Sequence, residues 1–316
     1  MLGTIRVGHA QDTGALTGCT VFLPPAGSVA ACEVRGGAPG TRETAMLSPA
    51  FTVECPNAIL FTGGSAFGLD AASGVVRYLE ERGTGFPTPG GPVPIVSAAV
   101  IYDLDLGEPG VRPDSRMGYE ACGAAHTEDE REGSVGAGTG ASVGNVYGRA
   151  RSTRGGFGIY RFHADSFKLE VAAVVNALGE VVDSSGAVLA GVRDESDRYV
   201  SAEKALCGTA GIARGCMENT TLVLVATNAK LSCAQTWRLA AQGHNGIARA
   251  IRPSHTRFDG DTVFALATGE VDAPPDAVET LAAMGAAEAI RAGVMRATAA
   301  GGIPCAADML GRRAGG

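Results

Sequence analysis

The chain has 316 residues, of which 45% are apolar, 19% charged and 5% aromatic. This length and composition allow a large buried core and exclude an intrinsically disordered protein. The formal charge of −7 and the absence of a Lys/Arg-rich stripe argue against nucleic acid as the main partner. No signal-peptide pattern follows Met1 and no apolar run reaches membrane-span length, so we expect a soluble cytoplasmic protein with no membrane partner.

The first recognisable elements lie within residues 57–94. Residues 57–61 are apolar and favour a strand, which ends at the turn of residues 62–64. Ser65 is expected to act as the N-cap of a helix that extends to Gly83, because apolar side chains then recur at helical spacing. Four prolines lie between residues 84 and 94, which predicts a loop.

The remainder of the chain alternates strand and helix patterns. Residues 114–132 are polar and charged, and we expect them to form a surface excursion. Apolar, β-branched runs predict strands at 167–175, 221–226 and 261–268. Helical patterns cover 234–251, where Gly243 weakens the middle, and the Ala-rich segment 275–299. Strands flanked by such helices favour one layered domain spanning residues 1–316.

Two glycine-rich segments resemble nucleotide or nucleophile motifs only in part. Residues 133–145 lack the Gly-Lys-Ser/Thr sequence that a phosphate-binding loop requires, and no dinucleotide fingerprint is present. The turn at residues 63–68 lacks the spacing of a nucleophile elbow, because Phe67 occupies the last glycine position. Nucleotide binding is therefore disfavoured.

Neither the cysteines nor the histidines have the spacing of a metal site. No Cys-x-x-Cys or His-Glu-x-x-His motif occurs. We therefore expect reduced, mostly buried cysteines, structural or surface histidines, no metal and no cofactor. The residues concerned are Cys19, Cys32, Cys55, Cys122, Cys207, Cys216, Cys233, Cys305, His9, His126, His163, His244 and His255.

The most informative segment begins at Glu218 and contains two adjacent threonines. Thr220 and Thr221 follow Asn219 directly, at the start of an apolar strand pattern. If the peptide bond before Thr220 is cut, its hydroxyl and its new α-amine become a nucleophile and a base on one residue. No other part of the sequence supplies a comparable reactive group.

A pair of carboxylates is the natural partner of such a group. Asp259 and Asp261 are two residues apart, so on an extended segment they project to the same side, and Gly260 leaves room between them. A polar turn before a strand is the simpler interpretation of these residues alone. Beside a terminal amine and hydroxyl, they are suited to ordering the hydroxyl, setting the charge of the amine and relaying protons.

These motifs together resemble those of the DmpA-type L-aminopeptidase/D-esterases, a self-cleaving peptidase family that includes β-peptidyl aminopeptidases and nylon-oligomer endo-hydrolases. The resemblance extends along nearly the whole chain, and the Asp-Gly-Asp triplet is most similar to the 6-aminohexanoate-oligomer hydrolase branch. It rests on residues 62–72, 136–144, 174–179, 219–221 and 259–262.

The resemblance implies an α+β fold, a four-layer αββα sandwich of the type found in this family and in ornithine acetyltransferases. It implies cleavage between Asn219 and Thr220, which gives an α chain of residues 1–219 and a β chain of residues 220–316. Both chains stay in one globule, commonly within a homotetramer. The implied activity is hydrolysis of small peptides, amino-acid amides or esters, or 6-aminohexanoate oligomers.

Site roles follow the matching positions. Thr220 is the expected nucleophile, Asp259 and Asp261 are its partners, and Asn176 is the oxyanion donor. Tyr102 matches a pocket tyrosine, and Phe67 and Asn145 are candidates for tuning substrate binding. Relatives often carry a Lys at the position of Asn145, whose amide cannot supply a positive charge.

Two other functions remain open at this stage. The first is acyl transfer of the ornithine acetyltransferase type, although the motif around Thr220 differs from that of those enzymes. The second is a non-catalytic binding protein that retains the fold.

Overall fold

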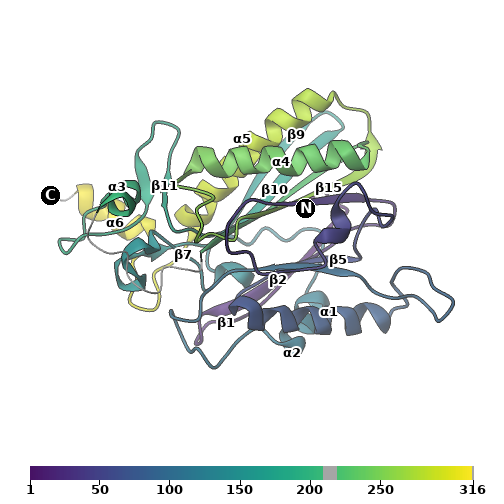
Figure 1. Ribbon diagram of the computed structural model, residues 1–316, viewed down its shortest axis with the longest axis horizontal. Helices are drawn as coiled ribbons and strands as arrows, with labels where there is room; N and C mark the ends of the chain where they lie inside the picture. Colours follow the sequence, from purple (N-terminus) through teal and green to yellow (C-terminus); the bar gives the residue numbers. More distant parts are fainter. Residues whose placement is uncertain (209–218, 315–316) are drawn as a thin grey trace.

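The computed structural model describes residues 1–208 and 219–314, which form four stacked layers (Figure 1). Two mixed five-stranded sheets lie face to face in the middle, and a pair of helices covers the outer face of each sheet. The αββα sandwich expected from the resemblance is confirmed. No helix in these two ranges is both long and apolar enough to cross a membrane.

The first sheet contains the strand that begins at Thr220. Its strands in spatial order are β3 (Val29–Val34), β15 (Thr262–Val271), β13 (Thr220–Ala229), β10 (Phe167–Asn176) and β9 (Phe157–Ala164). All ten residues of β13 are buried, as expected for a central strand covered on both faces. β13 runs parallel to β15 and antiparallel to β10. The start of β13 therefore lies beside the start of β15 and the end of β10.

The second sheet packs against the inner face of the first. Its strands in spatial order are β1 (Arg6–Asp12), β2 (Thr17–Leu23), β5 (Ala58–Thr62), β6 (Val96–Val100) and β4 (Thr41–Arg42). Phe61 of β5 joins the two sheets, because its ring lies 5.1 Å from that of Phe22 and 5.8 Å from that of Phe264 in β15. Such aromatic contacts contribute both buried area and a preferred geometry.

The outer helices are α4 (Cys233–Ala250) and α5 (Pro275–Arg296) on the first sheet, and α1 (Ala71–Glu80) and α2 (Ser115–Gly123) on the second. Ser232 and Gln235 form a capping box that fixes the start of α4. Gly243 has a packing role inside α4, because a Cβ there would lie 2.7 Å from Cγ1 of Val263. The glycine that weakens the helix pattern is what allows α4 to approach the sheet closely.

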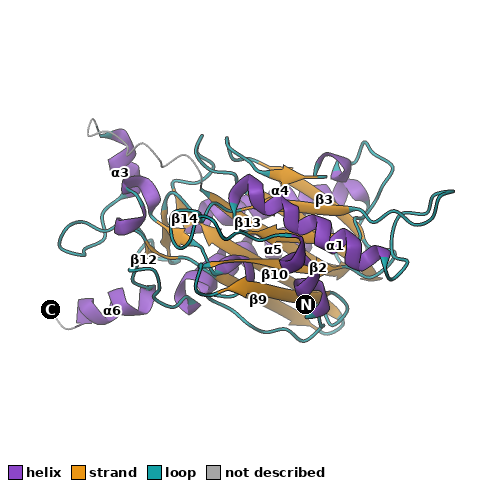
Figure 2. Cartoon of the chain, turned by 90° about the horizontal axis from the view of Figure 1, so that it is seen from below, coloured by secondary structure: helices purple, strands orange, loops and turns teal. Residues whose placement is uncertain are grey.

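Shorter elements complete the fold. The short helices are η1 (Ala45–Leu47), η2 (Ser65–Asp70), η3 (Gly136–Gly138), η4 (Asn145–Tyr147), η5 (Arg149–Arg151), α3 (Ala202–Cys207) and α6 (Ala306–Ala314). The short strands are β7 (Ser142–Val143), β8 (Thr153–Arg154), β11 (Glu180–Val182), β12 (Val188–Ala190) and β14 (Ile251–Arg252). Figure 2 shows α3, β12 and α6 gathered at one end of the sandwich.

Six of the elements expected from the sequence are confirmed, with ends that differ by three residues or fewer: β5, β10, β13, α4, β15 and α5. The segment at 84–94 contains no helix or strand, as its prolines predicted.

Two expectations for the second sheet's helices are wrong. The polar segment 114–132 contains α2, which buries Met117, Ala121 and Cys122. Their spacing puts them on one helix face, and the surrounding charges hid that face in the sequence. Ser65 does not cap a helix: it is the first residue of η2, and Gly64, which has φ = 80°, occupies the N-cap position without a side-chain hydrogen bond.

Candidate active site

Thr220 lies at the start of β13, with only 5% of its surface exposed. Its Oγ1 donates a hydrogen bond to the carbonyl oxygen of Asn219 over 2.6 Å. The same oxygen accepts from the backbone N–H of Gly260, also over 2.6 Å. The carbonyl that precedes Thr220 thus receives two short hydrogen bonds, one of them from the adjacent hydroxyl.

Gly260 is held against Thr220 by the pairing of the two segments. Asn219 and Asp259 form a parallel bridge, which continues the parallel pairing of β13 with β15. A Cβ on Gly260 would lie 2.7 Å from Thr220 Oγ1 and 2.9 Å from the carbonyl oxygen of Ala38. Only glycine leaves space for the Thr220 hydroxyl at this position.

The carboxylate of Asp259 is buried beside this bridge. Its Oδ2 accepts from the Thr256 N–H over 2.8 Å and from the Thr256 hydroxyl over 2.6 Å, and its Oδ1 accepts from the Leu178 N–H over 3.4 Å. Burial, reinforced by the negative charge of Asp261, raises the pKa of Asp259 to about 7. This carboxyl can therefore exchange a proton near neutral pH.

Asp261 contacts the residue after Thr220. Its Oδ1 accepts from the Thr221 N–H over 2.7 Å, and its Oδ2 accepts from the backbone N–H and from Nδ1 of His255, over 3.0 and 2.8 Å. Burial alone would lower the pKa of His255, but the hydrogen bond to Asp261 and the negative charge of that carboxylate raise it. The sequence grouped His255 with structural or surface histidines, and no local motif connects it to the site.

Asn176 is the last residue of β10 and is paired in register with Thr220. Its side chain is fully buried. Its Oδ1 accepts from the Ser142 N–H over 3.1 Å and from Arg149 over 2.9 Å, and its Nδ2 donates to the Tyr102 carbonyl oxygen over 3.1 Å. The carboxamide is thereby held next to the start of β13.

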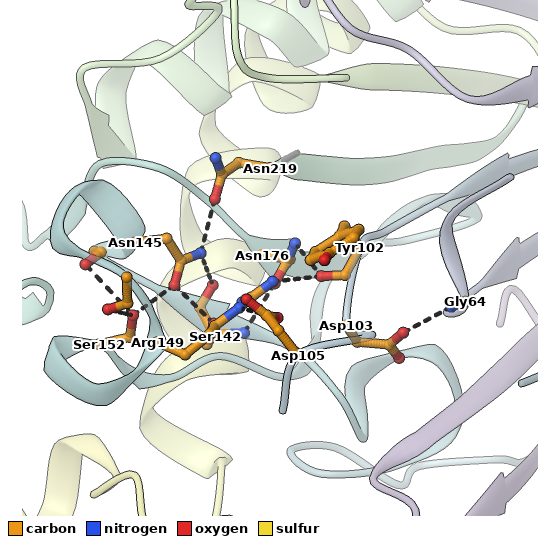
Figure 3. Close-up of polar contacts among 12 residues, drawn as sticks. Gly64, Tyr102, Asp103, Asp105, Ser142, Asn145, Arg149, Ser152, Asn176 and Asn219 are labelled. Carbon is orange, nitrogen blue, oxygen red and sulfur yellow. Dashed lines mark hydrogen bonds and ion pairs between the residues drawn. The ribbon is translucent and has the colours of Figure 1, made fainter. Parts of the chain in front are cut away.

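Asn145 follows Gly144, which has φ = 77°. Its Nδ2 donates to Oδ1 of Asn219 over 2.8 Å, and its Oδ1 accepts from the hydroxyls of Ser142 and Ser152 over 2.8 and 2.6 Å (Figure 3). Asn145 therefore holds the side chain of the residue that precedes Thr220.

A cavity of about 340 Å³ opens beside Thr220. Its lining is mostly small and apolar: Ala38, Pro39, Gly40, Ser65, Ala66, Val100, Tyr102 and Thr220. The Gly64 turn in its wall is fixed by Asp103, whose Oδ1 accepts from the Gly64 N–H over 2.7 Å. Tyr102 thus faces the same space as Thr220, whereas Phe67 does not line it. The Phe67 side chain is 61% exposed and packs under the guanidinium of Arg112.

No group of three or more His, Cys, Asp or Glu residues is arranged to hold a metal ion within residues 1–208 and 219–314. Cys216 and Glu218 lie outside these ranges.

The pattern of peptidase family S58 matches residues 2–312, and so spans the entire sandwich. The chain belongs to peptidase family S58. It is therefore a hydrolase of peptide or amide bonds, as the resemblance of its motifs implied.

The relatives of this chain include proteins named as an aminopeptidase and as an oligomer endohydrolase. An uncharacterized aminopeptidase of Mycobacterium tuberculosis is 43% identical, and the alignment covers 98% of this chain and 96% of the relative. The 6-aminohexanoate-oligomer endohydrolase of Paenarthrobacter ureafaciens is 33% identical, over 85% of this chain and 74% of the relative.

Two solved structures have the same fold as this chain. A Burkholderia sp. β-aminopeptidase superposes with a TM-score of 0.71 and 21% identity, over 99% of this chain and 92% of that one. The L-aminopeptidase D-Ala-esterase/amidase of Ochrobactrum anthropi, described as a variant of the Ntn-hydrolase fold, superposes with a TM-score of 0.70 and 18% identity. The alignment covers 93% of this chain and 84% of that one.

Proposed function

We propose that this peptidase is an N-terminal-threonine amide hydrolase that matures by cleavage between Asn219 and Thr220. The observation that carries the proposal is the pair of hydrogen bonds on the Asn219 carbonyl oxygen, from the Thr220 hydroxyl and the Gly260 N–H, at 2.6 Å each. A nucleophile, its target carbonyl and an N–H donor for the developing oxyanion then lie together beside one cavity.

Maturation follows from this arrangement. The Thr220 hydroxyl oxygen attacks the carbonyl carbon of Asn219, and the negative charge that develops on the carbonyl oxygen is stabilised by the Gly260 N–H. The C–N bond then breaks, the nitrogen takes up a proton and an ester joins Asn219 to the Thr220 oxygen. Water hydrolyses this ester, which leaves a carboxylate on Asn219 and a free amine and hydroxyl on Thr220. Asp259, with a pKa raised to about 7 by burial, is suited to moving the protons.

Turnover of substrate uses the same hydroxyl in a second role. The Thr220 hydroxyl attacks an amide or ester carbonyl in the cavity, and the α-amine of Thr220 accepts its proton. The Nδ2 of Asn176 donates to the oxyanion, which stabilises it by roughly 3–4 kcal/mol for one good donor. The leaving amine or alcohol departs with a proton, and water releases the acyl group. Asp261 holds the Thr221 N–H and thereby fixes the backbone that carries the nucleophile.

The cavity and the relatives support a proposal for the substrate class. A mostly apolar lining with Tyr102 at one side suits small peptides, amino-acid amides or esters, and flexible 6-aminohexanoate oligomers. Asn145 influences substrate binding indirectly, by positioning Asn219. Phe67 presents an exposed ring and directly follows Ala66, which lines the cavity. We expect a homotetramer, which analytical ultracentrifugation of the purified protein would measure.

Intact mass spectrometry tests the proposal directly. The wild-type protein should give two chains, of residues 1–219 and 220–316, and should hydrolyse members of a panel of amino-acid p-nitroanilides and 6-aminohexanoate oligomers. Thr220→Ala should give one uncut chain without activity. A wild-type protein that stays intact and still hydrolyses these amides would rule the proposal out.

A further inference from the structure

Arg149 is an arginine with a largely covered side chain that the sequence did not single out. It is the first residue of η5 and follows Gly148, which has φ = 85°. Its side chain is only 9% exposed and reaches the end of β10 (Figure 3). Taking a guanidinium out of water costs free energy unless its N–H groups find hydrogen-bond partners.

The guanidinium joins the side chain of Asn176 to the backbone of Tyr102. Its Nη1 donates to Oδ1 of Asn176 over 2.9 Å and its Nη2 donates to the carbonyl oxygen of Tyr102 over 2.6 Å. Its Nη1 also contacts the hydroxyl of Ser142. Asn176 Nδ2 donates to the same Tyr102 carbonyl oxygen, so the arginine and the carboxamide form a closed set of hydrogen bonds.

This set fixes which end of the Asn176 carboxamide is the oxygen. Oδ1 receives donors from Ser142 N–H and Arg149, so a flipped amide would point its NH₂ group at two other donors. Nδ2 is therefore kept on the side of Tyr102, which lines the cavity together with Thr220. One of its two hydrogens bonds to the Tyr102 carbonyl oxygen. The other is the donor that the proposed mechanism assigns to the oxyanion.

The charge of Arg149 also acts on this amide. A hydrogen bond from a guanidinium is stronger than one between neutral groups, and it polarises the amide so that its N–H groups become better donors. The ion-pair partner of Arg149 among the described residues is Asp105, whose side chain is 42% exposed and thus screened by water. The positive charge therefore acts on the buried groups around it, which include Asn176 and the carboxyl of Asp103.

We propose that Arg149 is a positioning residue that orients and polarises the carboxamide of Asn176 for oxyanion stabilisation. The inference rests on the proposed role of Asn176 in the hydrolase.

Kinetics of the mature enzyme test this role. Arg149→Met should lower kcat on the order of 10- to 100-fold, the cost of losing an orienting partner at comparable polar sites, with little change in KM. Arg149→Lys should also lower kcat, because one ammonium cannot reproduce the planar fork that bridges Asn176 and Tyr102. Arg151→Met is the matched control: Arg151 ends the same short helix, pairs with the exposed Glu195 and should leave kcat unchanged.

A double-mutant cycle separates positioning from a purely structural effect. In an Asn176→Ala background, Arg149→Lys should have almost no further effect on kcat. Rates are normalised to the amount of cleaved chain, measured by intact mass, and thermal unfolding monitors the fold. If Arg149→Met does not fold, Arg149→Lys carries the test. Wild-type kcat in Arg149→Lys, or effects of Arg149→Lys and Asn176→Ala that multiply, would overturn the inference. Activity of Thr220→Ala would instead overturn the proposed function itself.

Discussion

The imidazole Nδ1 of His255 lies 2.8 Å from Oδ2 of Asp261, whose other oxygen accepts the Thr221 N–H over 2.7 Å. A chain of hydrogen bonds thus leads from a partly buried histidine to the residue beside the proposed nucleophile. Since Asp261 raises the pKa of Asp259, the charge on His255 also influences the proton exchange of Asp259.

His255→Asn should slow chain cleavage on the order of 10-fold and move the acid limb of its pH–rate profile to higher pH. Loss of the imidazolium leaves the charge of Asp261 less compensated, which raises the pKa of Asp259 further. The measurement is the rate of chain cleavage between pH 5 and 9, followed by intact mass. His126→Asn, a change at an exposed histidine, is the control. An unshifted profile in His255→Asn would contradict the coupling.

The pKa of Asp259 predicts how stability changes with pH. The carboxyl has a pKa of about 7 in the folded chain because it is buried, against about 3.9 when unfolded. Between these values the folded state binds more protons than the unfolded state, so the free energy of unfolding falls as pH rises. The raised pKa of His255 acts in the same direction above about pH 6.5, where the unfolded imidazole loses its proton.

Asp259→Asn, made in the uncut Thr220→Ala chain, should remove the contribution of Asp259 to this pH dependence of stability. Relative to its parent, the variant should gain stability steadily from pH 4.5 to pH 8, because asparagine is neutral throughout. Urea unfolding at four pH values measures the difference. A difference that stays constant with pH would show that Asp259 ionises normally.

The strands and helices that carry the site were predictable, whereas the contacts between them were only partly so. The unbroken apolar run after Thr220 identified a buried strand, and the Asp-Gly-Asp spacing identified the second segment. Their proximity depends on the parallel pairing of β13 with β15, which no local pattern specifies. His255 and Arg149 were missed for the same reason: one lies in a loop and the other in a single helical turn, and each reaches the site through contacts set by tertiary packing.

Asn145→Asp should slow maturation more than it slows turnover. The Nδ2 of Asn145 donates to Asn219 Oδ1 and to the carbonyl oxygens of Ser142 and Ala177, and a carboxylate would instead repel all three. We expect cleavage to slow on the order of 10- to 100-fold, since Asn219 would leave its position. The time course of chain cleavage by intact mass, compared with kcat per cleaved chain, measures both effects. If chain cleavage and kcat fall by the same factor, Asn145 is needed for turnover as much as for maturation.

Gly260→Ala tests the contact between the two halves of the site. The added Cβ would lie 2.7 Å from Thr220 Oγ1 and 2.9 Å from the Ala38 carbonyl oxygen, so the hydroxyl must rotate away from the Asn219 carbonyl. A misplacement of this size should slow cleavage on the order of 100-fold while the sandwich remains folded. Gly123→Ala, where an added Cβ meets no atom within 4 Å, is the control and should mature normally. Because Gly260 contributes only a hydrogen atom and a backbone N–H to the site, normal maturation of Gly260→Ala would mean that cleavage does not begin from the 2.6 Å contact between Thr220 and Asn219.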